Sequence, residues 1–164
     1  MNHSFSETNS EDRHHMELAL QEARNALAKD EVPVGAVVVC GREVIGRGYN
    51  RREELQEPTG HAEILALRDA SSYVNSWRLE KSTIYVTLEP CVMCVGAILQ
   101  ARILRLVFGC PDPKGGAVES LFSLCNDPRL NHRVSVTRGV LQEECAEILK
   151  GFFSSLRQNG RANA

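Results

Sequence analysis

The sequence predicts a three-layer α/β/α domain with a five-stranded mixed sheet in its middle layer. Helical and extended patterns alternate along the chain, which is typical of α/β proteins. The continuous apolar, β-branched run Val34 to Cys40 indicates a buried central strand. Residues Thr83 to Phe108 form a strand–helix–strand pattern, whose two strands should be parallel with a right-handed crossover.

The first half of the chain should supply two helices and a hairpin. Met16 to Lys29 has its apolar residues at helical spacing and is predicted to be an amphipathic helix. After the strand at Val34 to Cys40, a Gly-Arg turn leads into a second strand, Glu43 to Tyr49, which predicts a β-hairpin. Good helix formers then continue from His61 to about Asn75, which predicts the second helix.

The second half completes the sheet and both helical layers. The strand–helix–strand unit divides into a strand at Thr83 to Thr87, a helix at Cys91 to Ala101 and a strand at Ile103 to Phe108. A loop containing Gly and Pro follows. The remaining elements are expected to be a short helix at Glu119 to Leu124, a fifth strand at Arg133 to Thr137 and a closing helix at Gln142 to Leu156.

Length and composition favour one folded domain with polar ends. The chain has 164 residues, 43% of them hydrophobic, and this size buries a sizeable core. We expect a disordered polar leader at residues 1–15, a domain at 16–157 and a polar tail at 158–164. No stretch has the length of a membrane helix, and the first residues lack the apolar core of a signal peptide. Six cysteines without an evident pairing pattern then favour free thiols in a reducing cytoplasm.

Two short segments predict a metal site. His61 and Glu63 stand two residues apart, and Cys91 and Cys94 follow Pro90 three residues apart. An imidazole and two thiolates are zinc ligands, and three of them leave a fourth tetrahedral position for water, as in catalytic zinc sites. The cysteine spacing puts both thiols on one face of a first helical turn, with Pro90 at the first helical position.

Glu63 is the predicted proton-transfer group of a hydrolytic reaction. Two thiolates and an imidazole neutralise the charge of zinc, so a nearby carboxylate is needed to take the proton of the water. Residues two apart in a helix face nearly opposite sides, so either His61 or Glu63 should lie at the helix cap. Cys91 and Cys94 could instead be a redox pair or half of a structural zinc site, but the chain has no second Cys-x-x-Cys.

Together these residues resemble the signature of the zinc-dependent nucleobase deaminases. The resemblance implies the cytidine-deaminase-like fold. Beyond the signature, residues 16–157 are similar to the bacterial tRNA-specific adenosine deaminases, which convert wobble adenosine to inosine. The segments that carry this resemblance are Val32 to Val37, Gly48-Tyr49-Asn50, His61 to Ile64, Tyr85 to Cys94, Val107-Phe108-Gly109, Asn131 to Val134 and Phe152-Phe153.

The resemblance implies a role for each matching residue. It makes His61, Cys91 and Cys94 the ligands of one Zn²⁺ per subunit and Glu63 the proton shuttle. It implies a homodimer that binds the anticodon stem-loop of a tRNA, with the target nucleoside flipped out of the loop. The expected substrate-binding residues are Asn50 as a hydrogen-bonding group, Val34, Leu88 and Ala62 around the base, Asp112 with Lys114 beside neighbouring nucleotides, and Phe153.

The charge distribution gives local support for an RNA substrate. Residues 1–100 hold 10 Lys and Arg against 15 Asp and Glu, whereas residues 101–164 hold 9 against 6. The formal net charge of −2 excludes a globally basic nucleic-acid binder, so recognition by one pocket and a few backbone contacts fits better. Two alternatives stay open. One is a deaminase of the same fold that acts on free guanine, cytosine or a cytidine nucleotide, and the other is a non-catalytic zinc-binding scaffold.

Overall fold

A computed structural model describes residues 3–160 and contains the five-stranded mixed sheet that the sequence predicts. Its strand order is β2-β1-β3-β4-β5. The pairs β1–β2 and β1–β3 are antiparallel, and β3–β4 and β4–β5 are parallel. The hairpin and the parallel strand–helix–strand unit are therefore confirmed. The strands are β1 (Gly35–Cys40), β2 (Glu43–Tyr49), β3 (Ser82–Leu88), β4 (Arg105–Cys110) and β5 (Ser135–Arg138).

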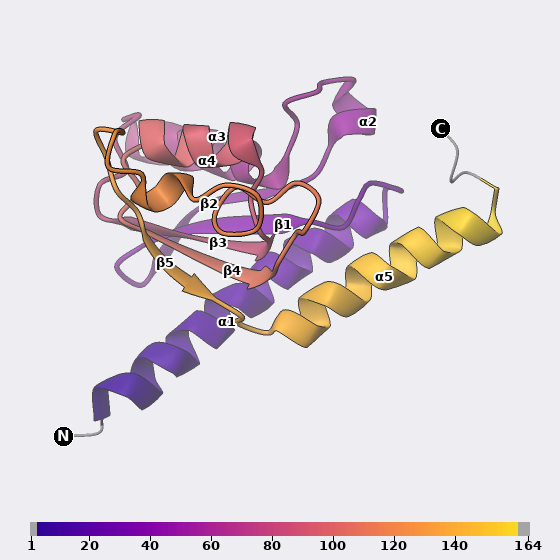
Figure 1. Ribbon diagram of the computed structural model, residues 1–164, viewed down its shortest axis with the longest axis horizontal. Coiled ribbons are helices and arrows are strands. Elements are labelled where there is room, and N and C mark those ends of the chain that lie inside the picture. Colours follow the sequence, from indigo (N-terminus) through magenta and orange to yellow (C-terminus); the bar gives the residue numbers. More distant parts are fainter. Residues whose placement is uncertain (1–2, 161–164) are drawn as a thin grey trace.

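Helices cover both faces of the sheet, so the three-layer architecture is confirmed (Figure 1). Helices α3 and α4 lie on one face, and α1 and α5 lie on the other. Among residues 3–160, no helix combines the length and the apolar character that crossing a membrane requires. The helices are α1 (His3–Leu27), α2 (Arg52–Leu55), α3 (Ala62–Val74), α4 (Val92–Gln100), the short 3-10 helix η1 (Leu124–Asn126) and α5 (Gln142–Gln158).

The core lies between the sheet and the two helical layers. The central strands are apolar on both faces, as expected of strands that helices cover on each side. Fully or almost fully buried side chains from three of them are Val37, Val38, Ile84, Val86, Leu106, Val107 and Phe108.

Helix α3 approaches the sheet closely because two glycines of β2 face it. A Cβ atom at Gly48 would lie 2.4 Å from the carbonyl oxygen of Ala62, and one at Gly46 would lie 2.4 Å from that of Ala66. Any larger side chain would therefore collide with the helix backbone. The absence of side chains at these positions fixes the height of α3 above the sheet, and with it the position of the helix start at His61.

Helix α1 extends into the segment that the sequence predicts to be a disordered leader. Helix α1 already begins at His3, and both Asp12 and His15 are buried. The carboxylate of Asp12 accepts hydrogen bonds from Arg105 at 2.8 and 2.7 Å and from the Tyr85 hydroxyl at 2.9 Å. The sequence suggests that Asp12 is exposed to solvent, but its charge is instead paired with that of Arg105 inside the fold. Met1 and Asn2 lie outside the described residues.

Smaller corrections concern local boundaries. Residues 119–123 form a turn and irregular loop rather than the expected helix, and the 3-10 helix η1 follows at Leu124–Asn126. The charged run Arg51 to Glu54 contains most of the short helix α2, for which no element is predicted from the sequence. Helix α4 begins at Val92, so Pro90 precedes the helix rather than opening it. Helix α5 extends to Gln158, the first residue of the expected C-terminal tail, of which residues 161–164 are not described.

We expect Gly48→Ala to destabilise the protein by about 3 kcal/mol, because the new methyl group would push α3 away from the sheet. Gly96→Ala is the matched control. It lies inside α4 with no atom within 4 Å of an added Cβ, and alanine should raise stability there by about 0.5–1 kcal/mol. Urea unfolding of both variants measures the difference. Equal stability of the two would contradict the packing role of Gly48.

Candidate active site

The three expected metal ligands meet where α3 and α4 begin. His61 is the N-cap residue of α3 and Cys91 is the N-cap residue of α4, both with extended dihedral angles. Cys94 lies one turn into α4 and is buried. The nitrogen Nδ1 of His61 lies 3.7 Å from Sγ of Cys91 and 3.5 Å from Sγ of Cys94. The three potential ligand atoms all lie within 4.8 Å of one another.

This donor set fits a tetrahedral zinc ion. Zinc–sulfur bonds near 2.3 Å and zinc–nitrogen bonds near 2.0 Å separate sulfur and nitrogen ligands by about 3.6 Å in a tetrahedron. The observed separations of 3.5 and 3.7 Å bracket that value. Neither His61 nor Cys91 uses its side chain to cap its helix, so both remain directed toward each other. The cap position of His61 also confirms the expectation that one member of the His61–Glu63 pair has non-helical dihedral angles.

The two thiols are electrostatically unequal. Hydrogen bonds from Cys94 and His61 lower the pKa of Cys91 to about 3, against the opposing effect of burial. The same contact with Cys91, together with burial, raises the pKa of Cys94 above its ordinary value. Metal ligation requires both sulfurs as thiolates, so binding of a metal ion would release protons from this pair.

Glu63 lies in the first turn of α3, beside the ligand cluster. Its side chain is buried, and burial raises the pKa of the carboxyl group above its usual range. A carboxyl group with a raised pKa can exchange its proton near neutral pH, whereas an exposed glutamate stays ionised there. The location and the shifted pKa suit a proton-transfer group.

Asn50 connects the end of β2 to the start of α3. Its Oδ1 accepts a hydrogen bond from the backbone N–H of Ala62 at 2.9 Å, and its own N–H donates to the carbonyl oxygen of Val34 at 3.1 Å. One of the free N–H groups at the beginning of α3 is satisfied by this contact. Asn50 thus orients the helix start that presents His61, in addition to lining the cavity described next.

A cavity of about 710 Å³ opens beside the ligand cluster. Of the expected substrate-binding residues, Val34, Asn50, Leu88, Asp112 and Phe153 line it, and so does Lys114. Ala62 does not line it, because its side chain is fully buried and its backbone N–H is bound to Asn50. Residues of the cavity wall that were not expected to bind substrate are Val32, Arg52, Glu89, Leu149, Lys150 and Arg157.

The two phenylalanines of α5 differ in exposure, as adjacent positions on a helix require. Phe152 is buried, whereas Phe153 is 43% exposed and lines the cavity. Their rings pack edge to face at 5.3 Å. Phe153, Lys150 and Arg157 all line the cavity from α5. The apolar periodicity of α5 indicates only its buried face, so it does not predict which of its other residues face the cavity.

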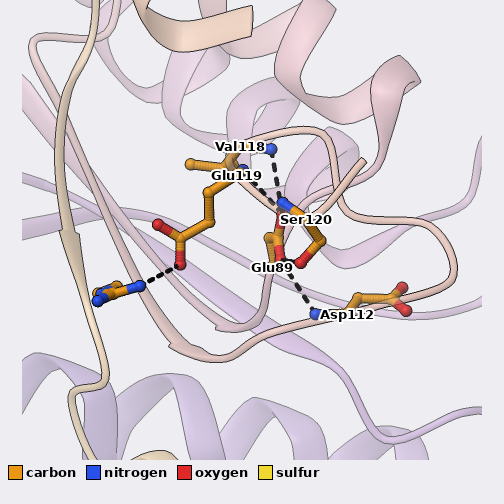
Figure 2. A network of polar contacts seen from close by, with 6 residues as sticks. Glu89, Asp112, Val118, Glu119 and Ser120 are labelled. Atoms are coloured by element: carbon orange, nitrogen blue, oxygen red, sulfur yellow. Dashed lines mark hydrogen bonds and ion pairs between the residues drawn. The ribbon is translucent and has the colours of Figure 1, made fainter. Parts of the chain in front are cut away.

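One side of the cavity is the loop at residues 111–120, which we call the rim loop. It contains Asp112 and Lys114, and it is attached to the buried Glu89 (Figure 2). The Glu89 carboxylate accepts hydrogen bonds from four backbone N–H groups and from the Ser120 hydroxyl. Burial by itself would raise the pKa of Glu89, but the bonds from Ser120 and the backbone outweigh burial and lower it.

The short helix α2, which forms another side of the cavity, is held by a second buried carboxylate, that of Glu31. Glu31 accepts a hydrogen bond from the backbone N–H of Glu54 at 2.8 Å, which fixes α2 and therefore Arg52. Glu54 also pairs with Lys29 and Arg51, both at 2.9 Å. These ion pairs are partly exposed to solvent, so we regard the Glu31 contact as the main attachment.

Comparisons with known proteins agree with this arrangement. A family profile for MafB19-like deaminases matches residues 9–157. The tRNA-specific adenosine deaminase of Bacillus subtilis is 45% identical over 153 residues, which are 93% of this chain and 95% of that protein.

Solved structures extend the similarity to the fold. A structure from studies of A-to-I editing by tRNA:A34 deaminases at the wobble position of transfer RNA is 51% identical, with a TM-score of 0.80, and the match covers 83% of this chain and 99% of that one. The guanine deaminase of Nitrosomonas europaea is 26% identical, with a TM-score of 0.71, over 87% of this chain and 84% of that one. The chain therefore belongs to the MafB19-like deaminase family and, within it, to the tRNA-specific adenosine deaminases.

Proposed function

We propose that this protein hydrolyses adenosine to inosine at the wobble position of a tRNA anticodon. The observation that carries the proposal is the His61–Cys91–Cys94 cluster beside the buried Glu63 at the floor of an open cavity. Relatives with about half of their residues identical act on tRNA, and the similarity to a guanine deaminase is much weaker. This difference favours tRNA over a free base.

The proposed chemistry assigns one role to each group. His61, Cys91 and Cys94 would hold one Zn²⁺ per subunit, which supplies an acidified water molecule as the nucleophile. Glu63 would take one proton from that nucleophile and pass it to the purine ring nitrogen, and it would then carry the remaining hydroxyl proton to the amino group, which leaves as ammonia. Asn50 would hydrogen-bond the flipped nucleoside, with Val34 and Leu88 as the apolar walls around its base.

The charges around the cavity support a polyanionic substrate. Four cationic side chains line it, and all four are exposed: Arg52, Lys114, Lys150 and Arg157. Of the acidic groups in the same wall, Glu63 and Glu89 are buried, which leaves Asp112 as the accessible one. A free base carries no phosphate, so this excess of positive charge is better suited to an RNA backbone.

A second copy of the chain is the proposed partner in solution, as the family resemblance implies. A shallow hollow of about 600 Å³ lies between α3 and α4, with Ile64, Leu67 and Ala97 in its wall and the 57% exposed Trp77 at its edge. We also propose a cytoplasmic location, where tRNA is found. All six cysteines lie within the described residues and are free thiols, as a reducing compartment requires.

We expect inosine at the wobble position when the protein acts on an arginine tRNA transcript with an ACG anticodon. Glu63→Ala should lower the rate about a thousandfold or more but keep zinc, because it removes only the proton carrier. Cys91→Ser should lose both activity and zinc. The measurements are inosine formation and metal content of each variant.

Cys40→Ser provides the matched control for the cysteine change, since Cys40 lies at the end of β1 outside the site. It should keep zinc and activity. Free guanine, cytosine and cytidine are tested in parallel. Ammonia release from one of these, with no inosine in the tRNA, would replace the proposed substrate. Full zinc occupancy in Cys91→Ser would remove that cysteine from the ligand set.

Lys150→Ala should raise the KM for an anticodon stem-loop RNA and lower its dependence on salt. Removal of one phosphate contact should reduce the slope of log binding constant against log salt concentration by about 0.7–0.9. The control is Lys81→Ala. Lys81 is an exposed lysine just before β3, at the opposite end of the strand from Leu88, which lines the cavity. The prediction fails if both variants have the same salt slope as the unmodified protein.

The proposed dimer predicts a species of twice the 18.2 kDa chain mass in sedimentation at micromolar concentration. Trp77→Glu should shift the equilibrium to the monomer, because it places a charge in the apolar hollow. Tyr73→Glu introduces the same charge at an exposed position outside the residues of that hollow and serves as the comparison. A monomeric unmodified protein would refute the proposed assembly.

A further inference from the structure

Glu89 is a buried carboxylate whose role the proposed chemistry does not include. It directly follows β3 and stands two residues before Cys91, with 2% of its surface exposed. Oε2 accepts the backbone N–H groups of Val118, Glu119 and Ser120 at 3.2, 3.1 and 3.0 Å. The other oxygen, Oε1, accepts the N–H of Asp112 at 3.1 Å and the hydroxyl of Ser120. Among the described residues, no Lys or Arg pairs with this carboxylate.

The rim loop depends on this carboxylate for its hydrogen bonding. A buried charge is costly unless hydrogen bonds satisfy it, and here the loop supplies all of the donors. The converse also holds, because three consecutive N–H groups that point to one place need an anionic acceptor there (Figure 2). The N–H groups of residues 118–120 are bound to Glu89, and a turn stands here where the sequence predicts the start of a helix at Glu119.

The loop is closely packed against the carboxylate. A Cβ atom at Gly116 would lie 2.2 Å from the carboxyl carbon of Glu89, so a larger residue here would displace the carboxylate or the loop. The next residue, Ala117, donates its N–H to the carbonyl oxygen of Pro90 at 2.8 Å. The loop therefore touches the segment that leads directly into Cys91.

Internal bonds carry this attachment to the cavity-facing end of the loop. Asp112, whose N–H is bound to Glu89, accepts the N–H of Lys114 at 3.1 Å and that of Gly115 at 3.2 Å through its Oδ1. Both Asp112 and Lys114 line the cavity. A chain of hydrogen bonds thus connects the buried Glu89 to an exposed cation at the cavity entrance.

We propose that Glu89 is a positioning residue that sets the RNA affinity of the active site by holding the rim loop, and through it Lys114, beside the cavity. The inference rests on the proposed function and adds a determinant of substrate binding. Glu89 itself need not touch the nucleotide or the metal. Its effect should appear in the binding of a structured RNA and leave the chemical step almost unchanged.

The test is Glu89→Gln, which keeps the shape of the side chain but removes its charge. An amide NH2 group would replace one carboxylate oxygen, and because it is a donor it cannot accept the backbone N–H groups that it faces. We expect KM for an anticodon stem-loop RNA to rise about tenfold, as loss of charge-assisted hydrogen bonds implies, with kcat within about threefold and zinc content unchanged. Glu80→Gln makes the same change at an exposed side chain and should have no effect.

A double-mutant cycle with Lys114→Ala separates positioning from a general structural role. If Glu89 acts through the rim loop, Lys114→Ala should raise KM in the unmodified protein and have little further effect once Glu89 is Gln. Additive changes in KM would overturn the inference. So would a fall in kcat or in zinc content with KM unchanged, because the residue would then support the metal site instead.

Ser120→Ala keeps the test decisive if Glu89→Gln does not fold. It removes one hydrogen bond to the same carboxylate, and KM should rise about threefold with kcat unchanged. An unchanged KM in this variant would count against the inference. If the unmodified protein forms no inosine in the RNA, the proposed function itself is overturned. If the unmodified protein is active and Glu89→Gln has the same KM, only the role of Glu89 is overturned.

Discussion

The site exists because two helices begin at the same place. His61 and Cys91 are each the residue before a helix, where extended dihedral angles let the side chain turn away from the helix axis. The positive ends of both helix dipoles then face the ligand atoms, which favours thiolates over thiols. This convergence requires both helices to be fixed closely on the sheet. Gly48 fixes α3, and the parallel strands that α4 connects fix the other helix.

Three buried carboxylates near the cavity show how environment decides the role of one chemical group. Burial raises the pKa of Glu63 above its usual range. Glu89 is equally buried, but its hydrogen bonds from Ser120 and the backbone outweigh burial and keep it ionised. Glu31 accepts a backbone N–H and fixes α2. Reactive and structural carboxylates are thus distinguished by the donors around them rather than by their depth in the fold.

Much of this arrangement could be predicted from the sequence because its signals are local. Apolar β-branched runs indicated the strands, and the spacing of His61 with Cys91 and Cys94 indicated the cluster. The cysteine motif did not reveal that Pro90 lies outside α4, since a helix start shifted from Pro90 to Val92 keeps the same cysteine spacing. The helix predicted at Glu119 to Leu124 is wrong, and nothing in the local sequence indicates that the N–H groups of residues 118–120 bind Glu89, about thirty residues away. The burial of Asp12 could not be predicted either, since its partner Arg105 is distant in the sequence.

The Asp12–Arg105 pair also affects how the protein must fold. It connects α1 to residues 93 positions later, and Arg105 in turn donates to Thr137 of β5. Contacts of such long sequence separation form late, because the intervening chain must first be ordered. During synthesis, the buried Asp12 would have no partner until Tyr85 of β3 and Arg105 of β4 had been made. Helix α1 can pack on the nearby β1 early, but its polar attachment to the sheet must wait for the later strands.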